Sequence, residues 1–208
     1  MPARIDPDKR RMQVIEAAFR LVVAGGVENL SLRKIAEESG LNIGSVRHYF
    51  GGHHELLTAA ADEAGNRMGR RLSAHPPEEL HGLEGDTAVD ALQALVETVM
   101  PIDEARHEEA IVVVELVMAS RTMSVFGAIS ERMGADLTSV LRDAFDTLEV
   151  PDTDLAAAQL SAVIGGLTLD TVTRHGNMSV DRMRAVLRAH LQMLLANTLK
   201  GAEPGLIH

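Results

Sequence analysis

The sequence predicts an all-α protein in two parts, an N-terminal three-helix helix-turn-helix domain joined to a C-terminal helical domain. Aromatic residues make up 2% of the 208 residues and hydrophobic residues 46%, so the core has to be aliphatic. Leu, Met and above all Ala favour helices over sheets. Apolar residues recur at helical spacing along most of the chain, and no stretch alternates as a half-buried strand would.

The first helix is expected to open at Asp6-Pro7 and to end at Gly25-Gly26. Asp is a favoured N-cap, and Pro is tolerated at the first helical position, where its missing N–H is not needed. The apolar residues of this segment fall on one face. They are Val14, Ile15, Ala18, Phe19 and Val22.

Residues 31–57, SLRKIAEESGLNIGSVRHYFGGHHELL, predict two short helices joined by a glycine turn. Ser31 is placed to cap the first, and Gly40 stands where a helix end needs a positive φ. In the second helix, Val46 and Phe50 are four residues apart and should point inward. This is the pattern of a helix-turn-helix, whose second helix enters the major groove of DNA.

Six more helices are expected, and the clearest break before the last five is residues 75–85, which contain Pro76-Pro77. Gly176 is expected as the C-cap of the penultimate helix. The expected ranges are about 53–72, 86–100, 103–120, 123–148, 153–175 and 179–199. We therefore expect a helix-turn-helix DNA-binding domain over 1–52, a connecting helix over 53–73, an effector-binding and dimerisation domain over 74–200, and a disordered tail over 201–208.

The helix-turn-helix segment also carries a family resemblance. The run of Ile35-Ala36, Gly40-Leu41, Gly44, Tyr49-Phe50 and Glu55-Leu56-Leu57 resembles the N-terminal DNA-binding domain of the TetR family of bacterial transcriptional regulators. The resemblance covers roughly residues 8 to 70. Beyond residue 74 the similarity is confined to length and helix layout.

Base-edge contacts usually arise at the start of the second helix, while hydroxyls and cations hold phosphates. Asn42 caps that helix, and Gly44 permits close approach of the backbone to DNA. We expect DNA contacts from Ser31, Asn42, Ile43, Gly44, Ser45, Arg47, His48, Tyr49 and His53.

Two of these residues depart from the family pattern. Arg47 stands where the family usually has Tyr, and His53 where it usually has a phosphate-binding Lys, so the role of that Lys cannot be carried over. A histidine that binds phosphate does so best when protonated. DNA affinity is therefore expected to weaken as the pH rises from about 6 to 8.

A surface pair of helices with scattered polar residues is the alternative interpretation of this segment. The net charge of −10 supports it at first sight. However, residues 1–71 carry a formal charge of +2 and residues 72–208 carry −12. The acid lies outside the helix-turn-helix, so a few placed cations can still contact phosphates.

Specific recognition by a helix-turn-helix generally requires two copies on two half-sites. The last two helices are the best candidates for a dimer interface, because Gly165-Gly166 allow close helix approach in a four-helix bundle. The alternative is that their apolar stripes bury only the chain's own core. The expected interface residues are Leu160, Ile164, Leu167, Leu187, Leu191 and Leu194.

The resemblance implies a small-molecule effector pocket among the middle helices. Methionines would give an adaptable apolar lining, although methionine at helical spacing is more often core filler. Glu115 interrupts an apolar run, as a ligand-binding carboxylate or as a solvated position, and Asp170 poses the same choice. The candidates for effector binding are Met100, His107, Glu115, Met118, Arg121, Met123 and Asp170.

Other classes of function find little support. The absence of cysteine excludes disulfides, thiol catalysis and cysteine-ligated zinc. No His-Glu-x-x-His run or phosphate-cradling glycine loop occurs, so we expect no enzyme activity, metal or cofactor. The N-terminus lacks a signal-peptide pattern, and no apolar run approaches the roughly 20 residues that span a bilayer. A cytoplasmic protein with no membrane partner is expected.

The sequence thus favours a homodimeric transcriptional repressor that binds a pseudo-palindromic operator and is released by a small-molecule effector. Two alternatives stay open at this point. The first is a dimeric regulator that responds to no ligand, and the second is a helical protein-interaction module that does not bind DNA.

Overall fold

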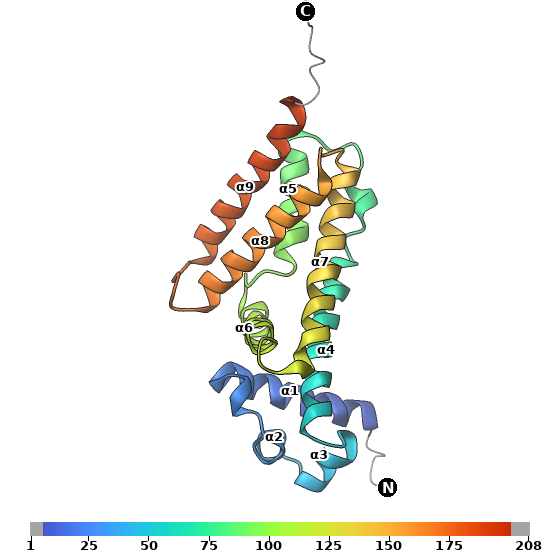
Figure 1. Ribbon diagram of the computed structural model, residues 1–208, viewed down its shortest axis with the longest axis vertical. Helices are drawn as coiled ribbons and strands as arrows, with labels where there is room; N and C mark the ends of the chain where they lie inside the picture. Colours follow the sequence, from blue (N-terminus) through green and yellow to red (C-terminus); the bar gives the residue numbers. More distant parts are fainter. Residues whose placement is uncertain (1–5, 201–208) are drawn as a thin grey trace, which may run out of the picture. The chain divides into compact units, whose positions relative to one another are not determined.

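A computed structural model describes the backbone of residues 6–200 and the side chains as far as residue 196. This part of the chain contains nine α-helices and no strand (Figure 1). The helices are α1 (Pro7–Gly25), α2 (Leu32–Ser39), α3 (Ile43–Tyr49), α4 (His53–Leu72), α5 (Gly85–Glu97), α6 (Glu104–Ala119), α7 (Gly127–Thr147), α8 (Thr153–Val172) and α9 (Val180–Lys200). The all-α prediction is confirmed, and the predicted tail over 201–208 lies outside the described residues.

Three helix ends differ from the sequence prediction by three residues or more. Helix α5 ends at Glu97 and not at residue 100. Helix α7 begins at Gly127, because Ser124–Phe126 forms a 3-10 turn instead. Helix α8 ends at Val172, with Thr173 in extended conformation as its C-cap, so Gly176 is not the cap that the sequence suggested. A different feature favours glycine at position 176, because a Cβ atom there would lie 2.3 Å from Cβ of Asp170.

The chain divides into two compact units. Unit 1 is built from residues up to Arg67 together with Glu108–Arg132, and unit 2 from Met68–His107 together with Met133 onward. Most of α6 and the start of α7 thus pack with the N-terminal helices. The expected functional boundaries near residues 52 and 73 remain a prediction, and the compact units follow a different division.

Helix α1 is the centre of unit 1. Asp6 caps it by accepting a hydrogen bond from Asp8 N at 3.0 Å, as the sequence predicts. Its buried face includes Phe19, and Arg67 of α4 lies 4.7 Å above the centre of that ring. Arg67 also pairs with Glu63 at 2.9 Å and with Glu16. This cluster fastens α4 to α1 by a cation–π contact with Phe19 and by the ion pair with Glu16, while the pair with Glu63 lies within α4.

Unit 2 has an aliphatic core, as the composition requires. Helix α9 packs against both α5 and α8. The largest side chains that the core encloses almost completely are Leu92, Met100, Leu141, Phe145, Leu160, Met183 and Leu187.

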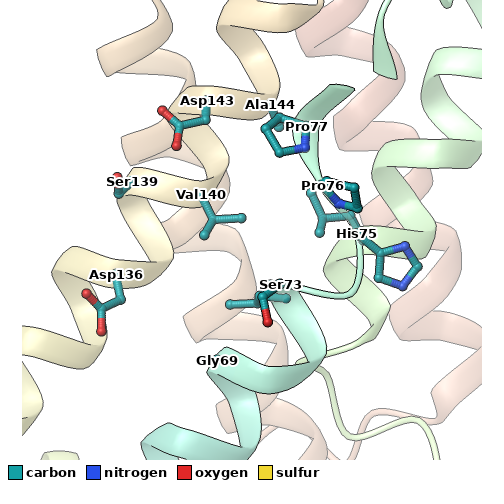
Figure 2. Close-up of a pocket in the computed structure, with 12 residues that line it drawn as sticks. Gly69, Ser73, His75, Pro76, Pro77, Asp136, Ser139, Val140, Asp143 and Ala144 are labelled. Atoms are coloured by element: carbon teal, nitrogen blue, oxygen red, sulfur yellow. The ribbon is translucent and has the colours of Figure 1, made fainter. Parts of the chain in front are cut away.

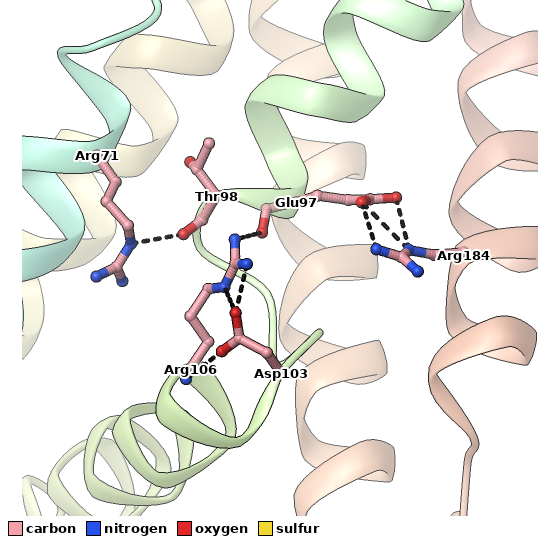
Figure 3. Close-up of polar contacts among 6 residues, drawn as sticks. All are labelled: Arg71, Glu97, Thr98, Asp103, Arg106 and Arg184. Carbon is pink, nitrogen blue, oxygen red and sulfur yellow. Dashed lines mark hydrogen bonds and ion pairs between the residues drawn. The ribbon is translucent and has the colours of Figure 1, made fainter.

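Arginines from two helices reach the carbonyl groups at the end of α5 (Figure 3). Arg71 Nε donates to the carbonyl of Thr98 at 2.7 Å, and Arg106 donates to the carbonyl of Glu97 at 3.3 Å. Arg106 also binds Asp103, and the pKa of that carboxyl is lowered by this hydrogen bond. Since cations are favourable at a helix C-terminus, these contacts stabilise the junction between α4, α5 and α6. A further contact in unit 2 joins α9 to α5, because Arg184 of α9 pairs with the Glu97 carboxylate of α5 at 3.2 Å.

Helix α8 is apolar on nearly every side. Within the described residues it alone is long and apolar enough to cross a membrane by length and composition, which the sequence analysis did not anticipate. Core helices of soluble proteins meet the same criterion, and 28% of its most apolar window is buried inside a single chain. Much of its apolar surface is therefore left uncovered by the rest of the chain.

His190 on α9 gives unit 2 a pH-dependent stability. Its Nε2 atom is buried and has no hydrogen-bond partner among the described residues, and burial lowers the pKa of the ring below 6.5. The unfolded chain therefore takes up a proton more readily than the folded one as the pH falls. The stability contributed by the neutral ring is complete above about pH 6.5 and is lost as the pH drops through the folded pKa.

We expect the His190→Leu variant to lose less stability than the wild type when the pH falls from about 7 to 5. The free energy of unfolding, measured by denaturation at several pH values and one protein concentration, checks this. The difference between the two proteins isolates His190 from the other histidines. Parallel pH profiles would show that His190 does not contribute.

Candidate DNA interface and effector cavity

The turn between α2 and α3 is fixed by local chemistry. Gly40 has φ 68° and ψ 21°, a left-handed conformation that costs glycine little. Its N–H and that of Leu41 return to the last turn of α2, with Leu41 N lying 3.0 Å from the carbonyl oxygen of Ala36. From α1, Gln13 Nε2 donates to the carbonyl of Ser39 at 2.6 Å. The angle between the two helices is therefore held by the glycine and by α1.

The orientation of α3 follows from its cap and its buried face. Asn42 caps the helix by accepting a hydrogen bond from Ser45 N at 2.8 Å, as the sequence predicts. Val46 and Phe50 are fully buried, and the guanidinium of Arg11 lies 5.0 Å above the Phe50 ring. With these two residues inward, the opposite face of α3 is turned to solvent.

Most of the expected DNA contacts lie on that outer surface. Asn42, Ile43, Gly44, Arg47, His48 and His53 are exposed, whereas Ser31, Ser45 and Tyr49 are partly buried. Ser31 caps α2 by accepting from Lys34 N at 3.2 Å. His48 and Tyr49 meet edge to face, with ring centres 5.4 Å apart. The contact of these nine residues with DNA stays a prediction, but Ile43, Gly44, Arg47 and His48 share the exposed side of α3.

His53 stands at the first position of α4, just after the turn that follows α3. Glu55 holds this turn, because its carboxylate accepts a hydrogen bond from Gly51 N at 2.9 Å. The position is suited to a phosphate next to the groove, where the family's lysine is expected, and the role of His53 there remains a prediction.

The residues expected to bind an effector do not form one site. Glu115, Met118 and Met123 line a cavity of about 450 Å³ in unit 1, together with residues of the loop after α1. Met100, His107 and Asp170 belong to unit 2, where Met100 is fully buried in the core. Arg121 is exposed and lines neither that cavity nor the unit 2 cavity described below.

Glu115 has a specific partner far away in the sequence. Its Oε2 atom accepts a hydrogen bond from the backbone N–H of Val27 at 3.2 Å, which joins α6 to the loop after α1. Gly26, the residue before Val27, has φ 75° and ψ 172°, and a Cβ atom at Gly26 would lie 2.9 Å from Glu115 Oε2. The carboxylate thus holds the turn between α1 and the helix-turn-helix from the side of α6.

We expect Glu115→Ala to destabilise unit 1 by about 1–3 kcal/mol, because the partly buried Val27 N–H loses a charged acceptor. Gly26→Ala should cost a similar amount through backbone strain and through contact with the carboxylate. In the double variant the contact between the new Cβ atom and the carboxylate is gone. Its loss of stability should therefore be smaller than the sum of the losses in the two single variants. Denaturation followed by tyrosine fluorescence checks this, because Tyr49 of unit 1 is the single tyrosine of the chain and tryptophan is absent.

Unit 2 contains its own cavity, of about 480 Å³, between the end of α4, the loop after it and α7 (Figure 2). Leu72, Leu95 and Ala144 form a buried apolar floor. The rim carries the carboxylates of Asp136 and Asp143, and no lysine or arginine is among the lining residues. The other lining residues are Gly69, Ser73, His75, Pro76, Pro77, Ser139 and Val140.

Sequence reasoning missed this second cavity. From the sequence, the segment with Pro76-Pro77 is interpreted as a break, and the polar residues of α7 receive no role. Asp136, Ser139 and Asp143 are spaced by three and four residues and so share one face. That spacing was the available signal, but it does not indicate which neighbouring segment covers the face.

Two protein-family models match the chain. One, described as bacterial regulatory proteins of the tetR family, matches residues 14–60. The other, described as the C-terminal part of BetI-type transcriptional repressors, matches residues 88–196, which is more than half of the chain.

Individual relatives agree with these matches. The HTH-type transcriptional regulator PksA of Bacillus subtilis is 29% identical over 93% of this chain and 94% of its own. The nicotine-responsive transcriptional repressor HdnoR of Paenarthrobacter nicotinovorans is 36% identical over 41% of this chain and 42% of its own. A crystal structure of a transcriptional regulator from Rhodococcus has the same fold, with a TM-score of 0.80 at 24% identity, over 90% of this chain and 96% of that one.

Proposed function

The chain belongs to the TetR family of DNA-binding transcriptional regulators, and on this basis we propose that it is a homodimeric repressor released from its operator by a small molecule. Membership of this family means that the chain is not an enzyme, and it removes the alternative of an interaction module that does not bind DNA. Binding to chromosomal DNA accords with a cytoplasmic location.

The observation that carries the proposal is the outer face of α3. The helix is short and capped, two buried residues fix its rotation, and the exposed face carries donors and small residues suited to a groove. One α3 reads only a few base pairs. A pseudo-palindromic operator with half-sites about one helical turn apart, roughly 34–36 Å, would match a two-fold dimer.

For the dimer interface we propose the exposed stripes of α8 and α9. The six residues that the sequence suggested are each at most 7% exposed in a single chain, because they pack its own core. The opposite face of α8 is exposed and largely apolar or small, and α9 continues it. The stripes consist of Leu155, Ala158, Gln159, Ala162, Gly165, Gly166 and Leu169 on α8, and of Ala185, Ala189, Gln192, Met193 and Ala196 on α9.

Several features support this choice of surface. Leu155 and Met193 are more than half exposed, which is costly for large apolar side chains unless a partner covers them. Alanine and glycine at the middle of the α8 stripe permit close approach of two helices. Pairing α8 and α9 across a two-fold axis forms a four-helix bundle.

For the effector we propose the cavity of unit 2. Its size and apolar floor suit a small organic molecule, and two carboxylates without a lysine or arginine in the lining favour a neutral or cationic ligand over an anionic one. Helices α4 and α7 line it and continue along the chain into unit 1, so a ligand that moves them can alter the helix-turn-helix. The name of the nicotine-responsive relative supports an organic effector.

The decisive experiment is a mobility shift with the duplex upstream of the protein's own gene, at low salt, with a shuffled duplex as control. We expect a dimer to bind the first duplex selectively. A compound library screened by thermal stabilisation then provides effectors, and each hit should weaken the complex because it favours a different state of the protein. If a folded dimer does not bind the duplex, the proposed operator binding is contradicted. If compounds stabilise the protein but do not release DNA, the alternative of a dimeric regulator that responds to no ligand is favoured.

A further inference from the structure

Ile43 has an unusual place on the surface of unit 1. It is the first residue of α3, and 42% of its surface is exposed, although isoleucine is among the residues that proteins bury most often. It stands at the end of the helix from which base-edge contacts usually arise. The next residue, Gly44, has no side chain, so DNA can come close to Ile43.

Base edges in the major groove offer one kind of apolar partner. The C5-methyl group of thymine is the apolar feature that they display, and apolar side chains contact it. The side chain of Ile43 has no group that can form a hydrogen bond to a phosphate or to a base donor or acceptor. If the outer face of α3 meets bases, the chemistry of Ile43 therefore selects a T·A pair.

Arg47 lies one helical turn after Ile43, on the same side of α3. It is exposed, and its guanidinium makes no hydrogen bond or ion pair with the described residues. Its five N–H donors thus have no partner within the described part of the chain. An arginine at the groove edge of a recognition helix fits O6 and N7 of guanine with two parallel hydrogen bonds.

Four residues of helix rise by about 6 Å, which is close to two base-pair steps of roughly 3.4 Å. We propose that Ile43 and Arg47 together select a T·A pair and a G·C pair within about three neighbouring base pairs of each half-site. This assignment rests on the operator binding proposed above, and it adds the identity of the bases.

The test begins with the full-length protein and a library of random-sequence duplexes, from which bound sequences are enriched and sequenced. We expect a motif with T and G close together in each half. In this motif, deoxyuridine then replaces thymine, which removes only the methyl group, and 7-deazaguanine replaces guanine, which removes only the N7 acceptor.

For the wild type, we expect the loss of one methyl to weaken binding about fourfold per half-site and the loss of N7 about fivefold or more. The Ile43→Ala variant should become insensitive to deoxyuridine and keep its response to 7-deazaguanine. Arg47→Ala, which removes every donor of the side chain, should show the reverse. All the replaced side chains are exposed, so circular dichroism should match that of the wild type.

Two variants serve as matched controls. Met12→Ala removes another exposed apolar side chain of unit 1, and Arg33→Ala removes an exposed arginine of α2. Neither should change the base preference, even if Arg33→Ala weakens binding to every sequence alike.

Other outcomes would overturn the assignment. Equal deoxyuridine effects in wild type and Ile43→Ala would show that another residue meets the methyl. An unchanged motif in Arg47→Ala, with the salt dependence reduced by about one counterion, would place Arg47 on a phosphate. If no sequence is enriched, operator binding itself fails together with this assignment, whereas an enriched motif without methyl dependence removes the assignment alone.

Discussion

Ala162→Asp is expected to convert the dimer to a monomer and to weaken operator binding by about 100-fold or more, because the two half-sites would no longer be bound by one molecule. Ala162 lies at the middle of the exposed stripe of α8. In an isologous interface the substitution places two carboxylates near the two-fold axis, where each loses water and both repel. Sedimentation and anisotropy titration with an operator duplex measure the two effects.

The fold of the variant should survive, since Ala162 is exposed in the single chain. Ala135→Asp, at an exposed alanine of α7 that belongs to neither stripe, is the matched control and should leave the dimer intact. A dimer that persists in Ala162→Asp, with unchanged DNA affinity, would place the interface on another surface.

The helix-turn-helix could be predicted closely from the sequence because its determinants are local. The caps at Ser31 and Asn42 and the positive φ at Gly40 each depend on residues within a few positions. The same applies to the buried pair Val46 and Phe50, which one helical turn brings to the same side. Such local determinants can be recognised in the sequence without knowledge of the tertiary fold.

The direction in which α8 and α9 turn their apolar residues could not be predicted in the same way. Helix α8 carries apolar or small residues both on the side of Leu160, which is buried, and on the side of Ala162, which is exposed. A helix that is apolar on all sides has no periodicity to tell the chain's own core from the surface offered to a partner. The sequence predicts both a core face and a partner face, but the six residues that it places on the partner face are buried in the core of the single chain.

Glu115 illustrates a second limit. An acidic residue inside an apolar run predicts either a ligand contact or a solvated position. In the structure its carboxylate meets the N–H of Val27, 88 residues away along the chain. Such a contact depends on how α6 packs in unit 1, and no spacing within the run encodes it. The cavity of unit 2 escaped prediction for the same reason, since three separate segments contribute to its lining.

Phe50→Ala is expected to have the largest effect on stability, about 3–5 kcal/mol, because it empties a fully buried aromatic position. The variant also loses the cation–π contact with Arg11 and the anchor that fixes the rotation of α3. DNA binding should disappear with it, since the outer face of α3 would no longer be held. Dimerisation, which we place in unit 2, should remain.

The single tyrosine makes this separable. Tyr49 fluorescence follows unit 1, whereas far-ultraviolet circular dichroism follows all helices. In Phe50→Ala the fluorescence transition should move to lower denaturant concentration, while most of the helical signal is lost at the wild-type midpoint. The counterpart Phe145→Ala, at a fully buried position of unit 2, should move the helical signal instead. If both signals move together in both variants, the two units unfold as one cooperative structure, and the loss of DNA binding in Phe50→Ala would then follow from global unfolding and not from α3 alone.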